Sequence, residues 1–309
     1  MKIVVNFWKI KEHNNRNTNN RTLLMKKTAQ VIWFCLLGCL SFATAAQERV
    51  YTVGVANFQA NLSMAAQLNP ILKWVGQRAG VELVMKSGYN FDDMQRHLAR
   101  GEYDFYIGFP SLQSMIRQSL SYKVIAALEG QAKSAIIVQY HSPYQKLSDL
   151  NGHEVAMGSR GIFMANVVPM SLLLDEGVRV KPLAVGNQES LVTEFKLGKY
   201  QAVAVAVNLG AFKRIMGKNN HPYRVLWESP PLMNYPLAVR ADVVPDDVVK
   251  RVQQAFIDMA QDAEGQAILE RSNQRPGIQW KGWKVASEQD YQFAIESYQR
   301  LSAVKTMEP

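Results

Sequence analysis

The chain has 309 residues, 48% of them hydrophobic and 20% charged, a composition that can bury a sizeable core and that excludes a disordered polypeptide. Its formal net charge is +9, but the first 46 residues hold seven Lys or Arg and one Glu, so the rest carries 28 basic and 25 acidic side chains, a net charge of +3. That part shows no clustered basic face of the kind that nucleic-acid binding requires, and its length suits two modest lobes or one large α/β domain.

The N-terminal region has the pattern of a secretory signal peptide. Residues 31–46 are almost wholly apolar or small, Lys26-Lys27 precede them, and Ala43-Thr44-Ala45 supplies a small-x-small cleavage site. We therefore place a signal peptide at residues 25–46 and predict a periplasmic protein. The run is shorter than the ~20 residues of a membrane-spanning helix, and the alternative is an uncleaved anchor. Residues 1–24 are then either an extended leader or the result of a start codon assigned too early.

Both cysteines, Cys35 and Cys39, lie within this leader, so the exported chain has no disulfide and no thiol chemistry. The segment Leu36–Cys39 also resembles a lipobox, in which Cys39 would carry a lipid anchor. Cleavage before Cys39 is thus the alternative to cleavage after Ala45 or Ala46.

Short strands then alternate with helices of about ten residues, a pattern typical of βαβ units and a mostly parallel sheet. Leu68, Ile71 and Val75 illustrate the apolar spacing that indicates a helix between the first two strands. The elements predicted in this part are strands at 50–56, 81–86, 103–108, 123–128 and 134–140, with helices at 62–78, 90–100 and 110–119.

The alternation restarts after residue 144. The elements predicted there are strands at 154–157, 179–185, 200–206, 223–228 and 235–240, with helices at 164–175, 188–197, 208–217, 245–262, 264–272 and 288–303. We predict an α/β fold of two lobes, each a mostly parallel sheet flanked by helices, with a ligand cleft between the lobes. The expected boundaries are 47–140 for the first part of lobe 1, 141–228 for lobe 2, and 229–309 for the return to lobe 1 with the C-terminal helices. The crossings fall near 140–142 and 228–234.

The turn Gly158–Gly161 lies between a predicted strand and a predicted helix. Free backbone N–H groups point outward at a helix N-terminus, so such a turn can bind an anion. Arg160 lies in the same turn and is either a bidentate clamp for a phosphate, sulfonate or carboxylate or an ordinary solvated residue.

Several segments together resemble the periplasmic solute-binding proteins of ABC transporters, of the phosphate/phosphite/phosphonate-binding type. The motifs that carry this resemblance, which covers about residues 50–273, are Lys146–Gly158 (KLSDLNGHEVAMG), Gly198–Val205, Gly101–Pro110, Leu172–Gly177 and Ala263–Leu269. It implies two α/β lobes that close on a ligand, the type 2 periplasmic binding protein fold.

The resemblance also implies site residues. A family Tyr after the second strand corresponds to Tyr89, and the turn over the ligand to Phe109–Ser111. A family Ser-Thr-Ser run that binds phosphoryl oxygens is replaced here by Ile162-Phe163-Met164, and a family His by Gln188, next to the retained Glu189. The departure indicates a ligand that is less charged, larger or partly apolar.

Strand ends facing such a cleft supply the ligand-binding candidates, because ligands of open α/β sheets bind beyond the carboxyl ends of the strands. The predicted ligand-binding residues are Phe58, Tyr89, Asn90, Phe109, Ser111, Arg160, Phe163, Asn166, Gln188, Glu189, Asn208 and Tyr235.

Catalytic and metal chemistry have little support in the sequence. His153-Glu154 lacks the second His of a zinc-protease motif, and Gly158–Gly161 lacks the Lys-Ser/Thr of a nucleotide-binding loop. We predict no catalytic residue, no metal and no cofactor. An enzyme resembling the thiamine-pyrimidine synthases is disfavoured by the export signal and by the lack of cysteine in the exported chain.

The predicted function is therefore that of an exported, monomeric substrate-binding protein that captures a small, phosphonate-like solute for uptake by an ABC permease. The alternative is a periplasmic ligand sensor that signals to a membrane-bound receptor. Neither predicts a nucleic-acid partner.

Overall fold

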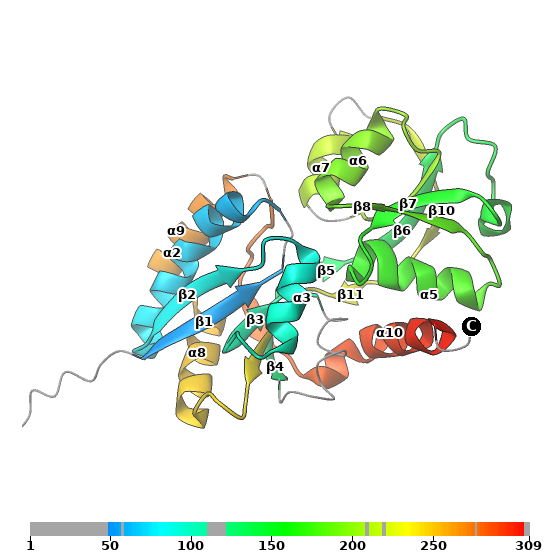
Figure 1. Cartoon of the computed structure of the whole chain (residues 1–309). Coiled ribbons are helices and arrows are strands. Elements are labelled where there is room, and N and C mark those ends of the chain that lie inside the picture. The colour runs from blue at the N-terminus through cyan, green and yellow to red at the C-terminus, as the bar shows by residue number, and fades with distance from the viewer. Residues whose placement is uncertain are drawn as a thin grey trace, which may run out of the picture. The chain divides into compact units, whose positions relative to one another are not determined.

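The structure, a computed structural model, contains two separate large β-sheets with helices around each (Figure 1). It describes residues 49–56, 59–109, 122–207, 210–217, 221–275 and 277–305. The predicted signal peptide with its cleavage sites, the predicted helix at 110–119, and the candidates Phe58, Ser111 and Asn208 lie outside the described residues. Residues from Arg49 onward form a single unit, which is described below.

The first sheet has the strand order β13-β4-β12-β3-β1-β2. Neighbours β1, β2 and β3 are parallel, whereas β12 is antiparallel to both β3 and β4. The strands are β1 (Val50–Val55), β2 (Glu82–Ser87), β3 (Phe105–Ile107), β4 (Tyr122–Leu128), β12 (Pro236–Arg240) and β13 (Trp283–Val285), and the helices of this first lobe are α2 (Asn61–Ala79), α3 (Phe91–Ala99), α8 (Asp246–Asp258) and α9 (Ala263–Asn273).

Helix α2 shows why the local prediction succeeded. Leu68, Ile71 and Val75 are buried on one side, and the helix ends at Gly80, whose φ of +66° is the left-handed conformation that glycine adopts most readily. The buried side of α2 packs against β2, α8 and α9.

The second sheet has the order β10-β6-β9-β7-β8. Strand β7 is parallel to β8 and β9, and β6 is antiparallel to β9 and β10. The second lobe comprises the strands β6 (Ser134–Gln139), β7 (Glu154–Gly158), β8 (Lys181–Val185), β9 (Ala202–Ala206) and β10 (Tyr223–Glu228), the 3₁₀ helix η1 (Leu147–Leu150), the π-helix η2 (Phe163–Val167), and the helices α5 (Val168–Asp175), α6 (Gln188–Lys196) and α7 (Gly210–Gly217).

The first crossing between the sheets differs from the prediction. Strand β6 pairs with β9 and β10, so the chain has entered the second sheet by Ser134 and not near Tyr140. Residues 134–138 are all buried, and a run that is apolar on both faces fits either sheet, so its sequence does not reveal its partners. The crossings themselves carry two short antiparallel strands, β5 (Gln131–Ala132) and β11 (Leu232–Met233).

The C-terminal part returns to the first lobe, as expected, but its last helix packs elsewhere. Helices α8 and α9 contact α2, whereas η3 (Glu288–Tyr291) leads into α10 (Gln292–Lys305), which packs against α5 and η2 of the second lobe. Figure 1 shows α10 beside α5, and Arg300 forms an ion pair with Asp175. The periodicity of a helix identifies its apolar face but not the surface that this face covers.

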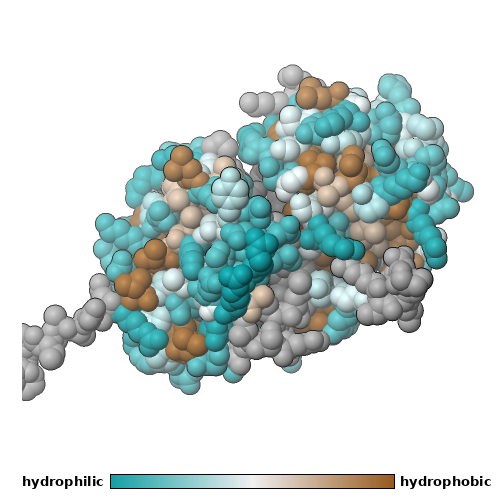
Figure 2. Space-filling view, viewed as in Figure 1, coloured by the Kyte–Doolittle hydropathy of each residue, from teal (hydrophilic) through white to brown (hydrophobic). Residues whose placement is uncertain are grey.

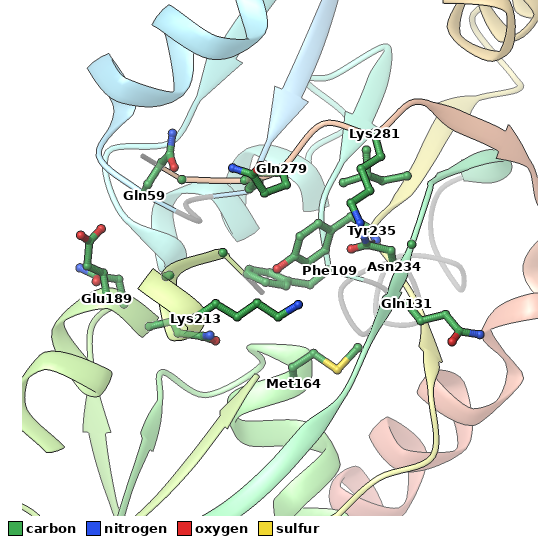
Figure 3. A pocket seen from close by; sticks show the side chains of 18 of the residues that line it. Gln59, Phe109, Gln131, Met164, Glu189, Lys213, Asn234, Tyr235, Gln279 and Lys281 are labelled. Atoms are coloured by element: carbon green, nitrogen blue, oxygen red, sulfur yellow. Dashed lines mark hydrogen bonds between the residues drawn. The ribbon is translucent and has the colours of Figure 1, made fainter. Parts of the chain in front are cut away.

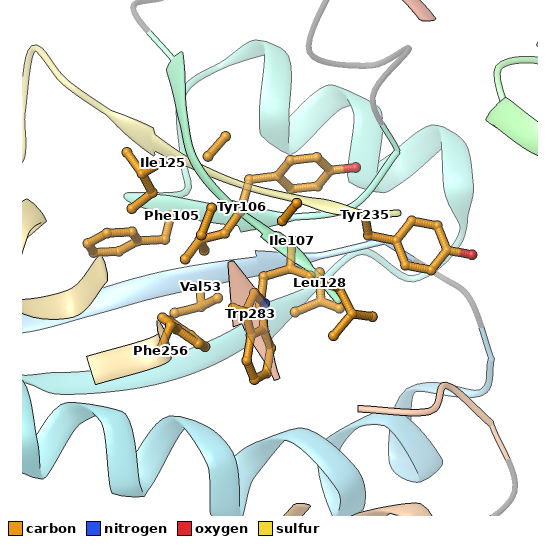
Figure 4. Close-up of a cluster of buried hydrophobic side chains, with 14 of the residues drawn as sticks. Val53, Phe105, Tyr106, Ile107, Ile125, Leu128, Tyr235, Phe256 and Trp283 are labelled. Atoms are coloured by element: carbon orange, nitrogen blue, oxygen red, sulfur yellow. The ribbon is translucent and has the colours of Figure 1, made fainter. Parts of the chain in front are cut away.

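The largest buried cluster lies mainly in the first lobe and extends to η2 of the second lobe, and Figure 4 shows part of it. Trp283, the first residue of β13, packs edge-on against Phe256 at a ring distance of 4.7 Å and stacks on Trp280 at 5.7 Å. Both tryptophans are almost fully buried and pack in this core. On the face shown in Figure 2, hydrophilic residues predominate and apolar residues form small separate groups. Among the described residues, no helix has the length and apolar character needed to cross a membrane.

Candidate ligand-binding pocket

A pocket with a cavity volume of about 230 Å³ is lined by residues from both lobes (Figure 3). The first lobe supplies Gln59, Phe109, Leu128, Tyr235 and residues 277–279 and 281, the second supplies Ile162, Met164, residues 187–189, Gly210, Ala211 and Lys213, and the crossings supply residues 129–131 and Asn234. A site built from two lobes is what the predicted fold implies.

Two aromatic rings give the pocket an apolar side. Phe109 and Tyr235 are both buried, with ring centroids 5.9 Å apart in an edge-to-face arrangement. The backbone N–H of Phe109 donates to the Tyr106 hydroxyl at 3.1 Å, which fixes the end of β3. Burial raises the pKa of Tyr235, so its hydroxyl stays protonated at physiological pH.

The π-helix η2 begins within the segment 162–164, which stands in place of the Ser-Thr-Ser run that the family resemblance implies. The N–H of Val167 donates to the carbonyl of Ile162 five residues earlier, and the Ser134 hydroxyl donates to the Met164 carbonyl at 2.6 Å. Ile162 and Met164 line the pocket, whereas Phe163 is only 2% exposed and belongs to the hydrophobic core. A single-turn π-helix often occurs at a functional site, and here it places two aliphatic side chains against the cavity.

The start of α6 presents side chains that already have partners in the protein. Asn187 caps the helix by accepting from the N–H of Ser190, and Gln188 both donates to the Ala206 carbonyl at 2.7 Å and accepts from its N–H at 3.3 Å. Glu189 forms an ion pair with Arg214 at 2.5 Å. These contacts hold α6 to the end of β9, at the edge of the pocket.

Two lysines complete the lining. Lys213 extends from α7, and Lys281 lies between α9 and β13 on the opposite side of the pocket. Figure 3 shows both ammonium groups pointing into the pocket, Lys281 toward Tyr235 and Asn234. Neither lysine emerged as a candidate from the sequence. Lys213 follows β9 closely enough that a search beyond the carboxyl ends of the strands could have identified it. Lys281 lies in a C-terminal segment whose sequence gives no sign of a binding site.

The structure places the other predicted site residues as follows. Phe109, Gln188, Glu189 and Tyr235 line the pocket, and Tyr89, Asn90, Arg160, Phe163 and Asn166 are not part of its lining. Tyr89 is 89% exposed, and Asn90 caps α3 by accepting from the N–H of Asp93. Arg160 is exposed, and Asn166 accepts from the N–H of Gly161 at 3.4 Å within its own turn. Ligand contact by any of the predicted residues stays a prediction.

No metal site accompanies the pocket: across the described part of the chain, no group of three or more His, Cys, Asp or Glu could hold a metal ion.

Comparison with known proteins identifies the family. A profile described as "ABC transporter, phosphonate, periplasmic substrate-binding protein" matches residues 53–291. The chain belongs to this family. The resemblance inferred from the motifs is thereby confirmed, and capture of a small solute for ABC-type uptake is favoured over the sensor alternative. No curated protein sequence matches the chain.

Solved structures agree on the fold. A binding protein component of an ABC phosphonate transporter from Pseudomonas aeruginosa has a TM-score of 0.68 at 13% identity, covering 84% of this chain and 89% of that chain. A protein from Xanthomonas citri bound to ATP has a TM-score of 0.70 at 18% identity, covering 84% and 99%. PhnD1 from Prochlorococcus marinus in complex with methylphosphonate has 0.67 at 16% identity, covering 83% and 99%. These likenesses show that the chain has the two-lobed type 2 periplasmic binding protein fold.

Proposed function

We propose that the exported protein captures an organic phosphonate or a closely similar oxyanion in the pocket between its lobes and delivers it to an ABC permease. The observation that carries this proposal is the position of the pocket: in a chain of the phosphonate-binding family, residues from both lobes line a single cavity. The complex of PhnD1 with methylphosphonate, a protein of the same fold, supports the ligand class.

The mechanism follows from the two-sided lining. A ligand that contacts both lobes binds the closed arrangement more tightly than an open one and shifts the population toward the closed state. The permease then recognises the liganded form. Asn187, Gln188 and Glu189 at the start of α6 already have partners within the protein.

The proposal includes export as a monomer. The signal peptide at residues 25–46 directs the chain to the periplasm, with cleavage after Ala45 or Ala46, or before a lipidated Cys39. Expression of the full chain in a Gram-negative host, followed by fractionation and intact-mass measurement, distinguishes the two cleavage sites. A chain that stays in the cytoplasm would contradict the export proposal.

The experiment that tests the binding function is calorimetric titration of the purified protein with a panel of alkylphosphonates, inorganic phosphate, phosphite and alkylsulfonates. We expect saturable one-to-one binding of at least one alkylphosphonate. No binding of any alkylphosphonate would contradict the proposal.

A further inference from the structure

Four charged side chains line the pocket, the basic Lys213 and Lys281 and the acidic Glu129 and Glu189. Glu189 is paired with Arg214. The carboxylate of Glu129 lies beside Gly282, with Cδ and Oε1 3.8 Å from where a Cβ on that glycine would be. Across the described residues, neither Lys213 nor Lys281 has an ion-pair partner within 4.0 Å. The internal stretches outside the described residues contain no Asp or Glu that could neutralise them: 57–58, 110–121, 208–209, 218–220 and 276.

The two lysines also come from different lobes. Lys213 is carried by α7, which follows β9 of the second sheet, and Lys281 precedes β13 of the first sheet. Their ammonium groups point into one cavity (Figure 3). Two like charges directed at a shared space repel each other, and an anion bound between them removes that repulsion while gaining charge-assisted hydrogen bonds.

The apolar part of the lining lies beside this cationic pair. Ile162, Met164 and Phe109 offer carbon surface but no side-chain hydrogen-bond donor. A bare inorganic oxyanion would leave that apolar surface exposed to water, whereas an organic substituent would bury it and gain the hydrophobic effect.

We infer that Lys213 and Lys281 form a two-sided clamp for the charged head of an alkylphosphonate dianion, whose alkyl group packs on Ile162, Met164 and Phe109. This inference rests on the proposed function. It names the residues that bind the anion in place of the Ser-Thr-Ser run that the family resemblance implies. Because each lobe contributes one lysine, the same anion binds the lobes to each other. A ligand with less charge closes the protein less effectively.

The test compares propylphosphonate with propanesulfonate, which has the same chain and a single negative charge, at a pH where the phosphonate is doubly charged. Calorimetry is performed on the wild type, Lys213→Gln and Lys281→Gln, with Lys250→Gln and Lys284→Gln as matched controls on exposed lysines outside the pocket. We expect each pocket substitution to weaken propylphosphonate binding about tenfold, the scale of a hydrogen bond to a charged group, and both controls to leave it unchanged.

Two further results are expected. Propanesulfonate binds the wild type more weakly and loses less on either pocket substitution. Added salt weakens propylphosphonate binding to the wild type more than to either pocket variant, because the exposed lysines are screened. Thermal unfolding of all four variants at the wild-type temperature confirms that they are folded.

The failures of the two proposals can be distinguished. If the wild type binds propylphosphonate and either pocket substitution changes its affinity by less than about twofold, the two-sided clamp is overturned and the proposed function stands. If the wild type binds no alkylphosphonate, the proposed function is overturned and the clamp with it.

Discussion

The side-chain amide of Gln59 donates to the side-chain oxygen of Gln67 at 2.7 Å, and this bond connects the pocket to a fully buried polar group. The amide nitrogen of Gln67 is shared among three backbone carbonyls, those of Ser272, Arg275 and Ile278, at 3.0, 3.2 and 3.3 Å. Helix α2 is thereby joined to the segment that carries Lys281 into the pocket.

Replacing Gln67 with Leu should therefore destabilise the protein. Three carbonyls and the Gln59 amide would lose a buried partner, and unsatisfied buried groups cost about 1–3 kcal/mol each where water cannot replace the bond, so we expect a loss of about 3 kcal/mol in the free energy of unfolding. Urea denaturation measures the change. Gln77→Leu, on the exposed side of the same helix, is the control and should change stability by less than about 0.5 kcal/mol.

Arg160→Ala should leave ligand affinity within about twofold of the wild type. Arg160 is exposed and is not part of the pocket lining, so the structure gives it no contact that a bound ligand would lose. Calorimetry with propylphosphonate provides the measurement. A loss of about 1.5–3 kcal/mol, the value of a charged hydrogen bond, would instead establish Arg160 as the anion clamp.

Inorganic phosphate should bind weakly or not at all. Ile162 and Met164 line the pocket, and their side chains offer a phosphate oxygen no hydrogen-bond donor. Met164→Ser should weaken propylphosphonate binding without weakening phosphate binding, since it removes apolar contact and adds a hydroxyl. Submicromolar phosphate affinity of the wild type would contradict this prediction.

Gly210→Ala should weaken ligand binding several-fold while leaving the fold intact. A Cβ on Gly210 would lie 2.9 Å from the Gly277 carbonyl oxygen and 3.4 Å from Gln279 Cγ, so α7 would have to move away from the first lobe. Gly217→Ala, at the other end of α7, is the control because no neighbouring atom of the described residues lies within 4 Å of its Cβ position. Equal affinities of the two variants would show that the close approach at Gly210 is not needed for binding.

Glu102 should make stability depend on pH in the acid range. The hydrogen bond with His97, followed by that with Lys86, lowers the pKa of Glu102 from 4.5 to about 2. The folded state therefore stabilises the ionised form of Glu102 more than the unfolded state does. This contribution to the free energy of unfolding is present above pH 4.5 and is lost as the pH falls toward 2. Glu102→Gln should flatten the fall in unfolding free energy over that interval. An unchanged slope in urea titrations would refute the assignment.

The local elements and the family could be predicted from the amino-acid sequence alone. Apolar spacing identified α2, the run Ala202–Ala206 identified β9, and the ordered motifs identified a phosphonate-type binding fold, because periodicity and turn residues act over only a few positions of the chain. Phe109, Gln188 and Glu189, chosen because they follow strands, and Tyr235, chosen because it lies near the second crossing, all line the pocket, and their contact with a ligand stays a prediction.

The sequence does not show which sheet β6 joins, which side chains of residues 162–164 line the cavity, or which charged side chains lie around it. These features depend on contacts in the folded chain. Ile162, the N-cap of the π-helix, and Met164 within it line the cavity, whereas Phe163 packs only in the core. Lys213 and Lys281 are 68 positions apart in the sequence and reach one cavity because α7 and the segment before β13 belong to different lobes that face each other across it. Such convergence depends on contacts distant in the chain, and no local pattern of residues encodes it.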